Sequence, residues 1–263
     1  MSQTQLILKN LTKTFYNQNG ERVGGITDIN LSVKKGEVVS IIGTNGAGKS
    51  TLFNCLAKNI EADSGEIILS DTNLSHQTSQ KASQKISRVF QDARMGTAPR
   101  MTVFENLMLA KKRGKKRGFS ISLTNENEME MKEYLSQFHL GLENQLDVPI
   151  ENLSGGQRQT VALVMATLLK PELLLLDEHT AALDPRTGRQ VMEMTAEMIK
   201  NDCLTTLMIT HSINDALEFS DRIILMHQGK IQREFKKEEI PELTPGSIYQ
   251  LLEDLVIMEA HLS

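Results

Sequence analysis

One short segment of the chain has the composition of a loop that binds phosphate groups. It reads Gly43-Thr44-Asn45-Gly46-Ala47-Gly48-Lys49-Ser50, which matches the pattern G-x-x-x-x-G-K-S/T, and Thr51 follows it. Glycines let the backbone curl so that successive N–H groups face an anion, and a helix that begins near Lys49 adds the positive end of its dipole. Lys49 would then reach the β- and γ-phosphates, and the Ser50 hydroxyl would ligate Mg²⁺. Taken alone, the segment predicts a nucleoside triphosphate site and leaves kinases and GTPases open.

Two adjacent carboxylates follow the most apolar run of the chain. The run 173–176 consists of leucines and predicts a buried strand, with Asp177 and Glu178 at its carboxyl end. Ligands of open α/β sheets bind outside that edge of the sheet. Asp177 suits the shell of a Mg²⁺ ion, and Glu178 suits the orientation and deprotonation of an attacking water. An isolated acidic pair often marks a solvated turn, but a pair beside a phosphate-binding loop predicts a hydrolytic site.

A second segment could also hold a phosphate. Leu153-Ser154-Gly155-Gly156-Gln157 precedes a helical pattern, so it offers a hydroxyl, two glycines and a helix N-terminus. Alone, such a sequence is a common helix cap. Because this segment precedes the predicted strand that ends at Asp177, it resembles the signature of the ABC ATPase superfamily. This second cradle, and the absence of an Asn-Lys-x-Asp guanine motif, argue against a small-molecule kinase or a GTPase.

The rest of that family's pattern occurs in the same order along the chain. Gln91 matches the Q-loop glutamine, Asp184 the D-loop aspartate, and His211 the switch histidine at a strand end. Phe15 matches the aromatic residue that stacks on adenine, and Tyr16 is the alternate candidate. The resemblance therefore extends over nearly the whole chain.

The resemblance implies how such a site works. ATP would lie between the phosphate loop of one chain and the Ser154, Gly155, Gly156 and Gln157 cradle of a second chain, in a head-to-tail homodimer. ATP would join the two chains and hydrolysis would release them, so the γ-phosphate would bias a two-state element. The implied metal ligands are Ser50, Gln91 and Asp177, and the implied catalytic residues are Glu178, His211 and Gln91.

One position departs from the family pattern. Proline usually follows the catalytic glutamate of the family, whereas His179 stands there in this chain. The histidine could alter the loop locally, face the second chain of the dimer, or be a tolerated surface substitution. The departure does not change the ATPase expectation.

Short apolar runs and helical patterns predict the elements that hold these residues. Strands are expected at 6–8, 29–33, 38–42, 66–69, 88–90, 173–176, 205–209 and 222–226, and helices at 50–59, 103–112, 128–138, 156–169, 186–201, 213–219 and 247–258. The alternation of strands and helices after residue 160 predicts an α/β fold with a mixed, largely parallel sheet.

We expect one ABC ATPase domain over residues 1–263. The P-loop core would comprise approximately 1–100 and 160–240 and include an N-terminal antiparallel β subdomain. A helical subdomain that carries the signature would be inserted at approximately 101–160, and a C-terminal helix would occupy 241–263.

Composition limits the partners. The net charge of −4 gives no basic field for a nucleic acid, and Cys55 and Cys203 form no metal or disulfide pattern. No window is apolar enough for a membrane helix, so a membrane role would need a partner. The resemblance implies separate transmembrane permease subunits and a peripheral place on the cytoplasmic face of the membrane. The alternative is an ABC ATPase that acts on DNA or ribosomes; such proteins usually carry coiled coils, zinc modules or tandem cassettes, which this sequence lacks.

Direction and substrate are expected from the resemblance as well. Exporter ATPases are often fused to their membrane spans, so a free-standing chain favours import with an extracytoplasmic substrate-binding protein. The permease would dock in a groove lined by 91–105. The segments 91–97 and 177–180 resemble a bacterial branch associated with tryptophan, tyrosine or related amino-acid uptake. The basic run 111–117 is either a solvated helix end or a contact for anionic headgroups or an acidic loop.

Overall fold

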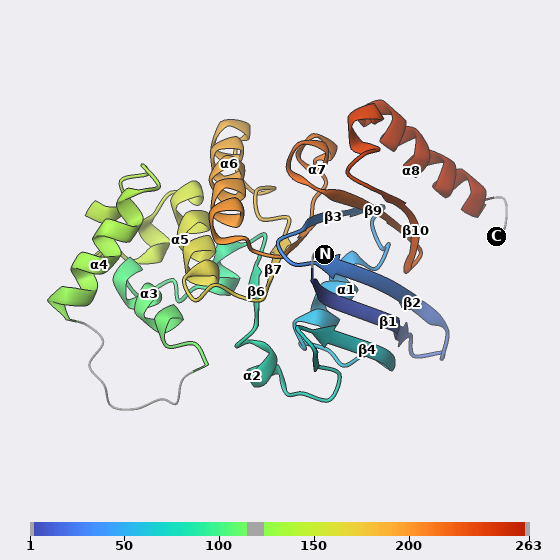
Figure 1. Ribbon diagram of the computed structural model, residues 1–263, viewed down its shortest axis with the longest axis horizontal. Coiled ribbons are helices and arrows are strands. Elements are labelled where there is room, and N and C mark those ends of the chain that lie inside the picture. The colour runs from blue at the N-terminus through green and yellow to red at the C-terminus, as the bar shows by residue number, and fades with distance from the viewer. Residues whose placement is uncertain (1–2, 115–123, 261–263) are drawn as a thin grey trace.

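The computed structural model describes residues 3–114 and 124–260, and a six-stranded sheet forms its centre (Figure 1). The strand order is β10-β9-β3-β8-β7-β6. The strands are β3 (Val38–Gly43), β6 (Ile86–Val89), β7 (Leu173–Asp177), β8 (Thr206–Ile209), β9 (Arg222–His227) and β10 (Lys230–Phe235). Neighbouring strands are parallel except for β9 and β10, which are antiparallel. The predicted mixed, largely parallel α/β sheet is confirmed.

A second sheet is antiparallel and has the order β2-β1-β4-β5. Its strands are β1 (Thr4–Tyr16), β2 (Arg22–Lys34), β4 (Ser64–Leu69) and β5 (Thr72–Asn73). The sequence predicts a strand only at 6–8 in the first of these, but β1 continues to Tyr16. The register shifts between Leu8 and Leu11, where Asn10 has a φ of 48°. This irregularity breaks the period of two that identifies a strand, which explains the short prediction.

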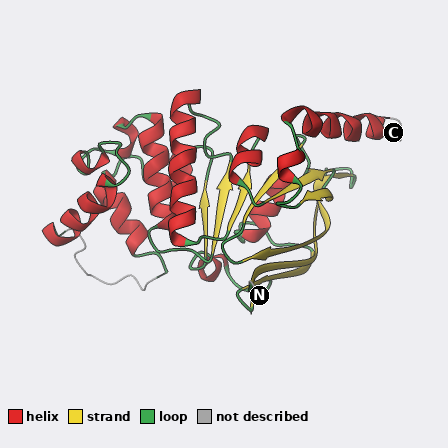
Figure 2. Ribbon diagram, turned by 45° about the horizontal axis from the view of Figure 1, so that its top comes forward, coloured by secondary structure: helices red, strands yellow, loops and turns green. Residues whose placement is uncertain are grey.

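Helices fill the chain between β6 and β7. They are α3 (Val103–Lys111), α4 (Asn125–Ser136) and α5 (Gly155–Thr167), with the short 3-10 helices η1 (Ala93–Gly96), η2 (Leu142–Asn144) and η3 (Ile150–Asn152). Figure 2 shows them on one side of the parallel sheet, with the antiparallel sheet on the other side. Thr102 and Glu105 form a capping box that fixes the start of α3.

The remaining helices connect and cover the strands. They are α1 (Lys49–Leu56), α2 (Ser79–Ala82), α6 (Pro185–Asp202), α7 (Ile213–Phe219), η4 (Ile240–Glu242) and α8 (Pro245–Ala260). The buried Ile248 anchors α8 in a small core with Ile213 and Phe235. The sequence does not predict α2, β5 or β10, because they are short or carry no regular apolar alternation.

The parallel sheet separates two larger cores, and β7 contributes to both. Leu173 and Leu175 belong to the core that faces α1 and the antiparallel sheet. Leu174 and Leu176 belong to the core that faces α3, α5 and α6. All of these leucines are 0% exposed, because both faces of the strand are covered.

The start of the basic run is engaged within the chain. Lys111 pairs with Glu130 at 2.5 Å, and the half-buried Arg113 donates to the Ser87 hydroxyl at 2.6 Å. Residues 115–117 lie outside the described residues. For Arg113, the expectation of a solvated helix end is therefore wrong.

Gly156 permits close packing of α5 on the first turn of α6. A Cβ placed on Gly156 would lie 2.3 Å from Cγ2 of Thr187, whereas a Cβ on Gly155 would lie 3.3 Å from Leu183. The absence of a side chain at Gly156 thus serves helix packing inside one chain.

We predict that Gly156→Ala lowers the free energy of unfolding by about 1–2 kcal/mol, because overpacking outweighs the helix propensity of alanine. Urea titration measures the effect. Thr187→Ser removes the clashing methyl group, so Gly156→Ala made in that background should be neutral or stabilising. An equal loss in both backgrounds would refute the packing argument.

Candidate functional site

The phosphate-loop segment joins β3 to α1 at the carboxyl edge of the parallel sheet. Gly43 ends the strand, and Gly48 caps α1 with a left-handed φ of 96°. A Cβ on Gly43 would lie 2.1 Å from the Met226 carbonyl oxygen, and a Cβ on Gly48 would lie 2.7 Å from the Gly25 carbonyl oxygen. Both glycines are therefore required by close backbone approach.

Lys49 is buried below this loop. Its side chain is 6% exposed, and its Nζ donates to the carbonyl oxygens of Gly43 at 2.8 Å and Thr44 at 3.0 Å. Burial lowers the pKa of Lys49, while the charges of Glu178 and Asp177 act to raise it. The structure thus brings the lysine and both carboxylates together.

The other residues of the loop differ in exposure. Asn45, Gly46 and Ser50 are exposed, Thr51 is half-buried, and the buried Ala47 donates its N–H to Thr44 at 3.2 Å. The Thr44 hydroxyl lies 3.2 Å from Nδ1 of His227 on β9.

Glu178 has a left-handed backbone and meets His211. Its φ is 51°, a conformation that is uncommon outside glycine, and its N–H donates to the Ile209 carbonyl at 3.0 Å. Oε1 of Glu178 lies 2.8 Å from Nε2 of His211, which follows β8. The Glu178 side chain is 18% exposed and that of His211 is 50% exposed, so the pair is open to solvent on the histidine side.

His179 points into the protein. It is 2% exposed, and its Nε2 lies 3.1 Å from the Thr195 hydroxyl on α6. That hydroxyl donates to the Val191 carbonyl at 2.7 Å, so it accepts from Nε2–H of the imidazole. Burial lowers the pKa of His179 to about 4. Among the sequence hypotheses, a surface substitution and contact with a second chain are therefore wrong, because the ring is enclosed by its own chain.

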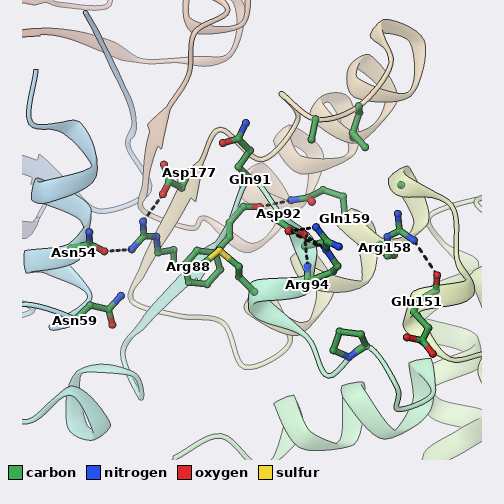
Figure 3. Close-up of a pocket in the computed structure, with 17 residues that line it drawn as sticks. Asn54, Asn59, Arg88, Gln91, Asp92, Arg94, Glu151, Arg158, Gln159 and Asp177 are labelled. Carbon is green, nitrogen blue, oxygen red and sulfur yellow. Dashed lines mark hydrogen bonds and ion pairs between the residues drawn. The ribbon is translucent and has the colours of Figure 1, made fainter. Parts of the chain in front are cut away.

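Arg88 on β6 is a site residue that the sequence analysis missed. It pairs with Asp177, its Nη1 donates to Oδ1 of Asn54 on α1 at 2.7 Å, and its guanidinium carbon lies 4.7 Å from the centre of the Phe90 ring. Figure 3 shows Arg88 between Asp177 and Asn54 at one end of a pocket of about 900 Å³. Gln91 and Gly155 also line this pocket. The sequence does place an arginine three residues before Gln91, which could have indicated a further site residue, but it does not reveal which carboxylate that arginine faces.

Ser154 and Gln157 form a capping box at the start of α5. The Ser154 hydroxyl accepts from the Gln157 N–H at 3.3 Å, and Oε1 of Gln157 accepts from the Ser154 N–H at 3.2 Å. Ser154 and Gly155 are exposed, whereas Gln157 is half-buried and Gly156 is buried.

Asp184 caps the start of α6 with its side chain. Its Oδ1 accepts from the Thr187 N–H at 3.1 Å, and hydrogen bonds from Thr187 lower the pKa of Asp184.

The two candidate adenine-stacking residues lie at the end of β1. Phe15 is 38% exposed, and Nζ of Lys13 lies 5.8 Å from the centre of its ring. Tyr16 is 66% exposed. Both aromatic side chains are accessible, so the structure leaves the choice between them open.

Comparison with known proteins identifies the family. Residues 26–181 match the sequence model of the family described as ABC transporter. The chain is 42% identical over 248 residues to a tyrosine transport ATP-binding protein of Clostridioides difficile, covering 94% of this chain and 98% of that one. It is 35% identical over 220 residues to the glutamine transport ATP-binding protein GlnQ of Geobacillus stearothermophilus, covering 81% and 85%.

Solved structures agree with this match. A dimeric, post-hydrolysis ATP-binding cassette, MJ0796 bound to ADP and phosphate, superposes with a TM-score of 0.75 at 32% identity and covers 88% of this chain and 98% of that one. The ADP form of the cassette MJ1267 superposes with a TM-score of 0.77 at 26% identity over 100% of both chains.

The chain belongs to the ABC transporter family, as an ATP-binding cassette subunit. It binds nucleotide and is an ATPase whose hydrolysis of ATP is coupled to transport. Across the described residues, the helices are all too short or too polar to cross a bilayer.

We predict that His179 makes stability sensitive to acid. The unfolded chain takes up the proton near pH 6.5, whereas the folded site resists it until about pH 4, so stability falls as the pH drops through this window. Between pH 7 and pH 5 the wild type should lose about 2 kcal/mol more than His179→Gln in urea unfolding. The exposed His76→Gln should behave like the wild type. Equal losses in all three proteins would show that His179 titrates normally.

Proposed function

We propose that this chain binds MgATP on its 43–51 loop, hydrolyses it in a head-to-tail dimer, and thereby powers solute import through separate membrane subunits. The observation that carries the proposal is the convergence of Lys49, Asp177, Glu178 and His211 at the carboxyl edge of one parallel sheet. They come from the ends of three strands: Lys49 follows β3, Asp177 and Glu178 lie at the end of β7, and His211 follows β8, so the buried strands fix their spacing.

ATP would be held by the loop and by Lys49. The backbone of Gly43–Gly48 curls around the space in front of α1, and the ammonium of Lys49 now bonds to carbonyl oxygens of that loop. Phosphate oxygens are stronger acceptors for a buried ammonium, so the lysine would exchange partners when the triphosphate enters. Phe15, or else Tyr16, would stack on the adenine.

The donors available to a metal fit Mg²⁺. Ser50, Gln91 and Asp177 offer a hydroxyl, an amide oxygen and a carboxylate, which are hard oxygen ligands. Within the described residues, no group of three or more His, Cys, Asp and Glu side chains could hold a metal. That suits Mg²⁺, which binds through one or two carboxylates and substrate phosphates. Mg²⁺ would supply charge neutralisation at the β- and γ-phosphates.

Hydrolysis would use Glu178 as the base. Its carboxylate takes a proton from a water as the water oxygen bonds to the γ-phosphorus, and the bond to the bridging oxygen breaks so that ADP leaves with that electron pair. His211, at 2.8 Å from Glu178, would orient the carboxylate and donate to the γ-phosphate. Gln91 would position the water and contact the metal.

The second half of each site would come from another copy of the chain. Ser154 and Gly155 are exposed at the N-terminus of α5, with the half-buried Gln157 and the buried Gly156 behind them. They would bind the γ-phosphate of the opposing nucleotide, with Asp184 beside them at the interface. The dimeric state of the similar cassette MJ0796 supports this arrangement.

The transporter would be an amino-acid importer. Relatives named for tyrosine and glutamine transport support that substrate class. Separate transmembrane permease subunits would dock at the groove lined by 91–105, and an extracytoplasmic substrate-binding protein would deliver the solute. The chain would then sit peripherally on the cytoplasmic face of the membrane, with no nucleic acid partner.

We predict that His211→Ala lowers kcat by about 10- to 1,000-fold while nucleotide affinity changes little, because a positioned catalytic group acts mainly in the transition state. Steady-state phosphate release gives kcat, and equilibrium binding of a fluorescent ATP analogue gives affinity. His76→Ala is the control. A kcat equal to that of the wild type would assign His211 to structure.

We predict that Glu178→Gln traps an ATP-bound homodimer, because it removes the base but keeps the side-chain shape. Bound ATP then persists at the interface and adds RT ln(1 + [L]/Kd) to dimer stability, about 2.7 kcal/mol at a hundredfold excess. Size-exclusion chromatography with light scattering, in ATP with Mg²⁺ and in ADP, measures the oligomeric state. A variant that stays monomeric with ATP would contradict the shared site.

A second substitution locates that interface. Ser154→Arg in the Glu178→Gln chain should abolish the dimer, because its side chain occupies the place of the opposing γ-phosphate. Ser154→Ala removes the same helix cap, at a cost of about 1 kcal/mol, without the bulk, and should leave a weaker but measurable dimer. Both variants should still bind ATP as monomers, since Ser154 would act on the partner's nucleotide.

A further inference from the structure

The carboxylate proposed to hold the metal already has a cation on it. Arg88 and Asp177 form an ion pair whose side chains are 10% and 16% exposed. The pair joins adjacent parallel strands, because Arg88 stands directly beside Leu175 in the β6–β7 register and Asp177 follows two residues later.

The surroundings hold the guanidinium in this position. Asn54 on α1 accepts a hydrogen bond from Nη1 of Arg88. The guanidinium carbon lies 4.7 Å from the centre of the Phe90 ring and 5.9 Å from the centre of the Phe53 ring. Nε of Arg88 is buried with no hydrogen-bond partner in the part of the chain that the structure describes. The guanidinium is therefore held in position while one of its N–H donors stays unused.

An arginine and a metal ion make opposing demands on Asp177. A carboxylate that accepts hydrogen bonds from a guanidinium is a poorer metal ligand, and two cations that share one carboxylate repel each other. Each cation therefore lowers the affinity of the carboxylate for the other.

We propose that Arg88 is the resting counter-ion of Asp177 and competes with Mg²⁺ for that carboxylate, so that metal binding with nucleotide must displace the guanidinium. The inference rests on the proposed metal role of Asp177. Arg88 is then a positioning residue: it keeps the acidic edge of β7 neutral when the site holds no nucleotide, and it lowers the affinity of the metal.

The same contact extends toward the signature helix. Arg88 lies on the Phe90 ring, the Phe90 carbonyl accepts from Nε2 of Gln159 on α5 at 3.0 Å, and Gln91 follows Phe90. A guanidinium that leaves Asp177 while it remains on the ring would report metal occupancy to the segment that connects the two cores.

Metal binding without turnover tests the proposal. The isolated chain saturated with ADP is titrated with Mn²⁺, and free Mn²⁺ is counted by electron paramagnetic resonance. Arg88→Met and Arg88→Gln should each bind Mn²⁺ about tenfold more tightly than the wild type, because one repelling charge is lost. Arg88→Lys keeps the charge and should stay within about threefold of the wild type. If Arg88 had only a structural role, the Mn²⁺ affinities of Arg88→Met and Arg88→Gln would not differ from that of Arg88→Lys.

Two further variants complete the design. Arg94→Met removes an arginine from the same pocket that is paired with Asp92 instead, so Mn²⁺ affinity should not change. If Arg88→Met fails to fold, Asn54→Ala removes one partner of the guanidinium and should tighten Mn²⁺ binding about threefold, the effect of one weakened hydrogen bond. No change in Asn54→Ala would overturn the proposal.

The remaining outcomes distinguish a failure of the counter-ion proposal for Arg88 from a failure of the proposed metal role of Asp177. Unchanged or weaker Mn²⁺ binding in the neutral Arg88 variants overturns the counter-ion proposal. So does a loss of ADP affinity measured in EDTA, since it would place Arg88 on the nucleotide. Asp177→Asn should weaken Mn²⁺ binding in every background. If it does not, the proposed metal role of Asp177 is wrong, which is a failure distinct from that of Arg88.

Discussion

The burial of β7 on both faces determines where the chemistry of this protein can occur. Its leucines alternate between two cores, so a one-residue shift of register would exchange Leu173 and Leu175 with Leu174 and Leu176 and disrupt both. With the strand fixed, Asp177 emerges at the carboxyl edge between β6 and β8. The loop after β3 and the histidine after β8 reach the same edge because parallel strands end together. The geometry of the site is thus a consequence of how the buried strands pack in the two cores.

At the end of β7 the chain turns through an unfavourable conformation, and the next residue holds it there. Glu178 has a left-handed backbone, which costs of order 1 kcal/mol for a side chain of this kind. The residue before a proline is restricted in its backbone angles, so a histidine at position 179 leaves Glu178 more freedom. The His179 imidazole then anchors the turn to Thr195 on α6. Because the His179 ring is buried against its own chain, burial rather than contact with nucleotide explains why histidine can stand where the family pattern has proline.

The sequence predicts the fold better than it predicts the contacts that the candidate site residues make. Continuous apolar runs and the glycine pattern identify the strands and the phosphate loop, because each is a local consequence of spacing. The extension of β1, the burial of His179 and the pairing of Arg88 with Asp177 depend on segments far apart in the chain. Residue types alone do not reveal such contacts. Gly156 shows the same limit, since its packing on Thr187 is invisible in a motif that also suits a phosphate cradle.

Several of these side chains have partners within their own chain. Lys49 bonds to carbonyls of its own loop, Asp177 holds Arg88, and Ser154 caps α5. Binding of nucleotide would therefore exchange partners rather than fill vacant positions, and the net free energy is smaller than the sum of the new contacts. A small net change would suit the proposed cycle of closure and reopening, because a two-state element responds only to the difference in affinity between its states. A site built from unpaired charges would bind more tightly and release its product more slowly. In the proposed mechanism, these contacts within the chain would therefore help to set how easily the nucleotide leaves.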